Sequence, residues 1–110
     1  MTEPKCCPLE ILLKHLSGQW TLYILWILDT NGTLRFGELR RKVDGISTKV
    51  LTERLRMLES NEMIHRDHKP TIPPQVTYRL TERGKELSEA LDHLYNLAVR
   101  WYGAEENRIV

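Results

Sequence analysis

Leucine residues recur at helical spacing near the beginning of the chain, at positions 9, 12, 13 and 16. An apolar stripe of this kind predicts an amphipathic helix. Pro8 suits its first position, because the N–H group that proline lacks has no intrahelical partner there, and Ser17-Gly18 is expected to end it. The almost wholly apolar segment from Thr21 to Leu28 predicts a second, buried helix, and Asn31-Gly32 is the turn signal that follows it.

Two further helices, the first of them short, are predicted between residues 36 and 61. Phe36, Leu39 and Val43 share one face of the first, and Asp44-Gly45 closes it. Ser47 is a favourable N-cap for the second, since its hydroxyl can accept a hydrogen bond from the first turn. Leucines at 51, 55 and 58 form the core stripe of this second helix. Its opposite face is polar and carries Lys49, Thr52, Glu53, Arg56 and Ser60.

The periodicity then changes from helical to alternating. Residues 64–68 and 76–80 alternate in polarity, which is typical of strands. The proline-rich loop 69–75 separates them, so we expect a hairpin with a protruding tip. Thr81 is a favourable N-cap for a last helix, whose apolar positions follow at intervals of four and three residues: Leu87, Leu91, Leu94, Ala98 and Trp101. Such a seam is typical of helices that pack along their length.

The order helix, helix, helix, hairpin, helix predicts a fold that is mainly α with a small β-hairpin. In a chain of 110 residues it fits a single domain, 1–110, with the architecture of a winged helix-turn-helix with N- and C-terminal dimerisation helices. The segments 36–43 and 47–61 form the helix-turn-helix pair, and Gly45 is the kind of residue that its turn often uses. The major groove of B-DNA is about 12 Å wide and admits one helix, so 47–61 is the candidate recognition helix.

The distribution of charge supports a nucleic-acid partner. The whole chain carries a net charge of +1, but residues 35–85 hold 12 of the 16 Lys and Arg and 7 of the 15 Asp and Glu, a net charge of +5. The remaining residues carry −4. A basic middle between acidic ends indicates that one surface meets a polyanion, with chance scatter of charge as the alternative.

Three groups of side chains are candidates for contact with a double-stranded DNA operator, with a merely solvated helix face as the alternative. The first lies on the candidate recognition helix, where Lys49, Thr52, Glu53 and Arg56 would read bases and Ser47 and Thr48 are further DNA-binding candidates. The second would grip phosphates around the preceding helix: Arg35, Arg40, Arg41 and Lys42. The third lies on the hairpin and would reach an adjacent groove or its phosphates: Lys69, Gln75, Thr77 and Arg79. An ion pair with Asp67 across the hairpin is an equal alternative for Arg79.

Six segments match one family in order and separation: Cys7-Pro8-Leu9-Glu10, Gly18-Gln19-Trp20-Thr21, Arg35-Phe36-Gly37-Glu38-Leu39-Arg40-Arg41, Gly45-Ile46-Ser47-Thr48-Lys49-Val50-Leu51-Thr52-Glu53-Arg54-Leu55, Pro73-Pro74-Gln75-Val76-Thr77-Tyr78 and Leu80-Thr81-Glu82-Arg83-Gly84. Across roughly residues 6–103 the chain resembles the HxlR-type transcriptional regulators of bacteria. The resemblance implies a dimeric winged-helix protein that binds an operator and represses or activates a nearby gene. It also implies a functional cysteine, which some members carry at the position of Cys7. Gln19 and Gln75 depart from the Lys and Arg that are common there.

The two cysteines are adjacent, and Cα atoms about 3.8 Å apart lie too close for the usual disulfide. Cys7 precedes the first helix, whose positive N-terminal end favours the thiolate, as does Lys5 nearby. Cys7 is therefore a candidate redox-sensing residue, with a packed, unreactive thiol as the alternative. The chain has no third cysteine, so a redox response would require the partner subunit, a small external thiol or the addition of an electrophile.

Other protein classes are not expected. The longest apolar run, residues 22–28, is far shorter than the roughly 20 residues of a membrane span, and the N-terminus lacks a signal-peptide core. We therefore expect a cytoplasmic protein without membrane contact. No catalytic triad or phosphate-binding glycine loop points to an enzyme or a cofactor. His65 and His68 would point to opposite faces of a strand, and His15 and His93 are far apart in sequence, so no metal is expected.

We expect the first and last helices to pair across the two-fold axis of a homodimer. The candidate interface residues are apolar: Leu9, Leu13, Leu87, Leu91, Leu94, Ala98 and Trp101. One alternative is a winged-helix protein-interaction module without DNA binding, in which Lys49 and Arg56 would be buried or neutralised. The other is a small enzyme with Cys7 as nucleophile, which would need His15 or His93 nearby as a base. The sequence leaves the small-molecule or oxidant inducer open.

Overall fold

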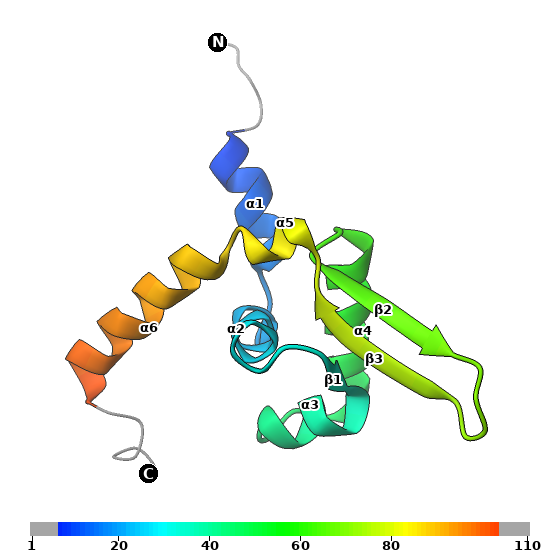
Figure 1. Cartoon of the computed structure of the whole chain (residues 1–110). Helices are drawn as coiled ribbons and strands as arrows, with labels where there is room; N and C mark the ends of the chain where they lie inside the picture. The colour runs from blue at the N-terminus through cyan, green and yellow to red at the C-terminus, as the bar shows by residue number, and fades with distance from the viewer. Residues whose placement is uncertain (1–6, 104–110) are drawn as a thin grey trace.

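The structure of the protein is a computed structural model that describes residues 7–103. Within this range a group of helices packs against one end of a small antiparallel sheet, whose hairpin projects outward (Figure 1). The elements are, in chain order, α1 (Pro8–Leu16), α2 (Thr21–Asn31), β1 (Leu34–Arg35), α3 (Phe36–Lys42), α4 (Thr48–Ser60), β2 (Ile64–Lys69), β3 (Gln75–Leu80), α5 (Glu82–Lys85) and α6 (Ser88–Tyr102).

The helices predicted for the first half of the chain are confirmed. α1 begins at Pro8, as the proline predicts. α2 continues three residues beyond its apolar segment, to Asn31, and Gly32 follows with a φ of +81°, a conformation that favours glycine. α4 begins after Ser47, whose hydroxyl oxygen accepts a hydrogen bond from the N–H group of Val50 over 3.1 Å. This N-cap fixes where the predicted recognition helix starts.

The predicted hairpin is present as part of a larger sheet. β2 and β3 pair antiparallel, with Ile64 opposite Leu80 and Lys69 opposite Gln75. The strand β1 was not predicted, because its two residues are too few to show an alternating pattern. It pairs with β3, so the strand order is β1-β3-β2 and the connection between α2 and α3 is attached to the hairpin. We call β2, β3 and their connecting loop 70–74 the wing.

The hydrophobic core lies between the sheet and helices α2, α3 and α4, which together form the body of the molecule. Its fully buried side chains come from all three helices and from β2: Ile24, Leu25, Leu39, Leu51, Leu58 and Ile64. The leucines predicted as the core stripe of α4 are at most 2% exposed. Burial of one such side chain stabilises the fold by about 1.5–3 kcal/mol. The stripe therefore fixes the rotation of α4 and keeps its polar face outward.

The predicted last helix is divided in two, which corrects the sequence prediction. α5 ends at Lys85, the backbone turns at Glu86 and Leu87, and α6 leaves in another direction (Figure 1). Gly84 holds α5 against the start of β2, because a Cβ atom there would collide with the main-chain carbonyl oxygen of Met63. One turn into α6, Leu91 is only 5% exposed and belongs to the core. The apolar seam is thus interrupted where the chain packs against itself.

The first and last helices extend away from the body (Figure 1). No residue of α1 is buried, and Leu9 and Leu13 are 59% and 55% exposed. On α6, Leu94 and Trp101 are 51% and 66% exposed. Large apolar side chains at this exposure, concentrated on two projecting helices, mark a surface suited to protein association.

Candidate nucleic-acid interface

The helix-turn-helix consists of α3, the turn 43–47 and α4. The main-chain N–H group of Arg35 donates to Oε1 of Glu38 over 2.8 Å, which stabilises the first turn of α3. In the turn, Gly45 has a φ of +94° and lies against the ring of Trp20. The N–H group of Ile46 donates to the carbonyl oxygen of Val43 over 3.2 Å. These contacts hold the two helices at a defined angle.

The outward face of α4 carries the side chains predicted to read bases. Among all the predicted DNA-contacting residues here, Thr52 is half-buried, and the others are exposed: the N-cap Ser47, Thr48, Lys49, Glu53 and Arg56. The face offers hydrogen-bond donors and an acceptor, which is the chemistry needed to read guanine and cytosine edges in the major groove. Lys49 and Arg56 are exposed, whereas the protein-interaction alternative expects them to be buried or neutralised.

A groove of about 500 Å³ separates this face of α4 from the wing. It is lined by Phe36, Thr52, Leu55, Arg56, Glu59, Arg66, Val76 and Tyr78. Arg66 was missed by the sequence interpretation, which assigned no role to it. The signal was nevertheless present, because Arg66 is in phase with the buried Ile64 on β2 and so lies on the strand face that packs on α4. The groove brings a second arginine next to Arg56.

The side chains predicted to grip phosphates are all exposed. Arg35 lies on β1, and the others form the last turn of α3: Arg40, Arg41 and Lys42. Cations at the C-terminal end of a helix also compensate its dipole. This arrangement therefore stabilises α3 while it presents positive charge beside the start of α4.

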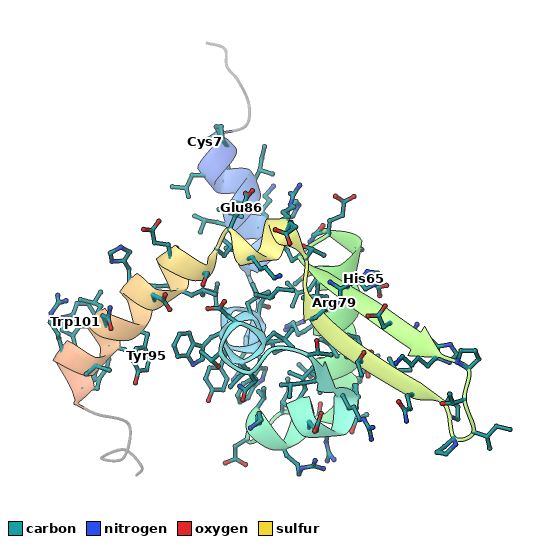
Figure 2. All side chains as sticks on the ribbon, in the orientation of Figure 1. Cys7, His65, Arg79, Glu86, Tyr95 and Trp101 are labelled. Atoms are coloured by element: carbon teal, nitrogen blue, oxygen red, sulfur yellow. The ribbon has the colours of Figure 1, made fainter. Side chains whose placement is uncertain are left out.

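On the wing, Arg79 forms the ion pair that was its structural alternative. Nε of Arg79 lies 3.4 Å from Oδ2 of Asp67, and Nε2 of His65 lies 2.8 Å from Oδ1 of the same carboxylate (Figure 2). Desolvation acts to raise the pKa of Asp67, but the hydrogen bond and charge of His65, and then those of Arg79, outweigh it. The pKa of Asp67 is therefore below its usual value. Arg79 is engaged within the hairpin.

The other predicted wing contacts differ in accessibility. Thr77 is half-buried on the central strand, opposite Arg35 on β1 and Asp67 on β2. Lys69 is exposed and Gln75 half-buried, and the two face each other at the outer end of the hairpin. Of the predicted wing residues, these two lie nearest to the loop at the tip.

The candidate dimer residues fall into two groups. Leu91 is in the core and Leu87 packs against it, so these two serve the fold of the protomer. The exposed remainder lies on α1 and the outer part of α6: Leu9, Leu13, Leu94, Ala98 and Trp101. Between α6 and α2 lies an apolar groove of about 300 Å³, whose lining includes Leu94, Ala98 and the stacked pair Trp26–Tyr95.

Cys7 is exposed and directly precedes α1, whereas Cys6 lies outside the described residues. The carbonyl oxygen of Cys7 accepts a hydrogen bond from the N–H group of Ile11 over 3.1 Å, as expected of an N-cap residue. Figure 2 shows it at the end of α1 that is farther from the body. Cys7 therefore combines solvent access with a position at the N-terminal end of a helix.

Within residues 7–103, no three His, Cys, Asp or Glu side chains lie together as metal ligands would. Nor does any helix in that range have the length and apolar character needed to span a bilayer.

Comparison with known proteins decides the family. Residues 15–106 match the family model described as HxlR-like helix-turn-helix. The chain belongs to this HxlR-like family. A protein of Fusobacterium mortiferum with the name MalR, described as regulatory, is 42% identical over 95 residues, 86% of each chain. An HTH-type transcriptional regulator of Methanothermobacter thermautotrophicus is 37% identical over 101 residues, 92% of this chain and 76% of that protein.

Solved structures of similar proteins share the architecture of this HxlR-like chain. The redox regulator HypR in its oxidised form aligns with a TM-score of 0.78 at 33% identity, over 94% of this chain and 100% of that one. Reduced YodB from B. subtilis aligns with a TM-score of 0.74 at 32% identity, over 89% and 96% of the two chains. The resemblance to HxlR-type regulators is confirmed, and the protein is a DNA-binding transcriptional regulator of the winged-helix type.

Proposed function

We propose that the protein acts as a homodimer that reads two half-sites of a DNA operator. The observation that carries this proposal is the outward polar face of α4, which lies beside the exposed cations of α3. Both belong to the basic segment 35–85, with its net charge of +5. The exposed apolar side chains are instead concentrated on α1 and α6. One part of the molecule is suited to DNA and the other to a second copy.

The two charged groups are assigned different tasks. Lys49, Thr52, Glu53 and Arg56 on α4 face the base edges, with Ser47 and Thr48 at the helix start nearest the groove floor or its phosphates. Phosphates are gripped by the cations that flank or end α3: Arg35, Arg40, Arg41 and Lys42. Lys69 and Gln75 on the wing extend the contact to the adjacent groove, and Arg66 lies between them and α4. Arg79 and Thr77 support the wing.

Dimerisation through α1 and α6 covers their exposed apolar surface. Leu9, Leu13, Leu94, Ala98 and Trp101 form the candidate contact. A single winged helix contacts one half-site only, whereas two linked copies gain affinity from both at once. The dimer therefore determines operator affinity as well as covering α1 and α6.

A redox or electrophile response through Cys7 is the finer part of the proposal. It is supported by the exposure of the thiol at the start of α1 and by the similarity to the redox regulator HypR and to YodB, whose structure is also known after diamide treatment. Modification of Cys7 changes the helix that we assign to the dimer contact. A shift of one subunit against the other then moves the two copies of α4 out of register with DNA.

The assignment of base and phosphate contacts is tested by selecting duplexes from a random-sequence pool and measuring two variants. Arg56→Ala is expected to relax preference at one operator position and cost about 1–3 kcal/mol, while Arg41→Ala weakens all duplexes alike and reduces the salt slope by about one. Arg83 is an exposed arginine on α5, and Arg83→Ala is the control that leaves base preference and the salt dependence of affinity unchanged. Unaltered affinity and preference in Arg56→Ala contradict the proposed role of α4.

A further inference from the structure

The joint between α6 and α2 combines three contacts. The hydroxyl of Ser88, the first residue of α6, lies 3.0 Å from both Oδ1 and Oδ2 of Asp29 near the end of α2. One turn along α6, Leu91 enters the core. One turn further, the ring of Tyr95 stacks on Trp26, with centroids 4.8 Å apart and planes at 13°. Spacings of three and four residues place these contacts on one face of α6.

The Asp29–Ser88 hydrogen bond is a directional contact at the start of this joint. Apolar burial of Leu91 is non-directional, and stacked rings tolerate an offset. A hydroxyl that donates to a carboxylate is restricted in both distance and angle. The bond also lies where α6 begins, directly after the turn at Glu86 and Leu87, which is the pivot of the projecting helix.

We propose that the Asp29–Ser88 hydrogen bond is a positioning contact that sets the direction of α6 relative to the body, and thereby the separation at which the dimer reads two half-sites. The inference rests on the proposed function, because it needs α6 in the dimer contact. α6 has 15 residues, so it is about 22 Å long, and a rotation of about 10° at Ser88 moves its far end by about 4 Å. That shift exceeds the spacing of successive base pairs, about 3.4 Å.

The pair contributes little to holding the core together. Both residues are half-buried and lie beside an open hollow of about 380 Å³ that Lys85 and Arg79 also line. Water can replace a lost partner at such a site, so the net effect of one hydrogen bond on folding is small. Removal of the bond therefore alters the direction of α6 in a protein that still folds.

The test compares wild type with Ser88→Ala, Asp29→Ala and the exchanged pair Asp29→Ser/Ser88→Asp. The exchanged pair restores a hydroxyl and a carboxylate in reverse positions, and an acidic residue in the first turn of α6 is compatible with its dipole. Thr30→Ala is the control, since the hydroxyl of Thr30 bonds to carbonyl oxygens of its own helix. Each variant is titrated with three kinds of duplex selected on wild type: the preferred half-site spacing, that spacing with two base pairs inserted, and one half-site.

Wild type is expected to lose at least tenfold in affinity on the insertion, which turns the second half-site by about 70°. In Ser88→Ala and Asp29→Ala the insertion lowers affinity threefold or less, because their affinity for the preferred spacing is already reduced. Their affinity for a single half-site and their dimer dissociation constant stay within about twofold of wild type. The exchanged pair regains the wild-type ratio of affinities for the preferred and the inserted spacing, and Thr30→Ala keeps that ratio throughout. An unchanged ratio in Ser88→Ala and Asp29→Ala, or no recovery in the exchanged pair, overturns the inference. A wild type indifferent to spacing instead overturns the proposed dimeric reading, and this inference with it.

Discussion

Nε of Arg54, on the recognition helix α4, donates a hydrogen bond to the main-chain carbonyl oxygen of Gln19 over 2.9 Å. Its guanidinium group lies so close to Gly18 that a Cβ atom there would be 3.1 Å from it. Arg54 therefore points back to the connection between α1 and α2, away from the polar face of α4. The bond links the connection that follows α1 to the helix that we propose reads DNA.

Arg54→Ala is expected to lower the free energy of unfolding by about 1 kcal/mol, the usual effect of losing one such hydrogen bond, and to leave base preference unchanged. Urea denaturation and titration with variant duplexes measure the two quantities. Arg56→Ala, two residues further on the same helix, is the matched control and is expected to change base preference while leaving the free energy of unfolding nearly unaltered. A change of base preference in Arg54→Ala would place this arginine on DNA.

Gly84→Ala is expected to lower the melting temperature sharply. The added Cβ atom collides with the main-chain carbonyl oxygen of Met63, and overpacking of a rigid neighbour costs about 1–3 kcal/mol. Gly37→Ala is the control, because its Cβ atom would meet only the guanidinium of Arg41 at 3.7 Å. Alanine within a helix is favoured over glycine by about 0.5–1 kcal/mol, so Gly37→Ala should be no less stable than wild type. Equal melting of the two variants contradicts the close packing of α5.

The elements with a repeating apolar face could be predicted from the sequence. The leucine stripe of α4 and its N-cap Ser47 are local signals, and burial and capping in the structure agree with them. The same stripe defined the opposite face, so the candidate base-reading residues followed directly. The ion pair of Arg79 was also foreseeable, because cross-strand neighbours are set by hairpin register.

Features that depend on distant residues could not be predicted. The apolar spacing runs through Leu87 without interruption, yet the helix breaks at Glu86 and Leu87, next to the close contact of Gly84 with Met63. Leu91 has the same spacing as Leu94, yet one packs in the core and the other is exposed. The Asp29–Ser88 bond joins residues 59 positions apart. Sequence periodicity says which face of a helix is apolar, and the tertiary fold decides what covers it.

Leu94→Arg is expected to produce monomers. Its side chain is 51% exposed in the middle of α6, and a charge there would be desolvated against a second copy. Analytical ultracentrifugation at micromolar concentration measures the association, and loss of operator affinity should accompany it. Ile72→Arg is the control, since Ile72 is 100% exposed at the tip of the wing, and its variant should remain dimeric. A wild type that sediments as a monomer contradicts the proposal.

Cys7→Ser is expected to abolish the response of DNA binding to diamide or a quinone. Diamide takes up two hydrogen atoms as two thiols form a disulfide, and a quinone adds to one thiolate. Wild type and Cys6→Ser should release the operator, and dithiothreitol should restore binding after diamide. If Cys7→Ser responds as wild type does, Cys7 has no part in the redox response and serves only as the N-cap residue of α1.

Asp67→Asn is expected to weaken the wing in a pH-dependent way. The folded-state pKa of Asp67 is lowered by His65 and Arg79, so its contribution to stability is present above the unfolded-state value of about 3.9 and is lost as pH falls through the folded-state value. The difference in stability between wild type and variant should therefore be present at pH 7 and shrink in acid. Arg79→Ala, alone and combined with Asp67→Asn, completes a double-mutant cycle. A difference that persists undiminished in acid contradicts the role of the ionised carboxylate.

The short strand β1 has a consequence for the cooperativity of the molecule. Because β3 lies between β1 and β2, Thr77 has Arg35 on one side and Asp67 on the other. Detaching the base of the wing therefore also frees Arg35, the residue directly before α3. Local opening of the wing is thus expected to extend to the helix-turn-helix. We therefore expect the surface assigned to DNA to open as one unit, so that a change that destabilises the wing also destabilises the start of the helix-turn-helix.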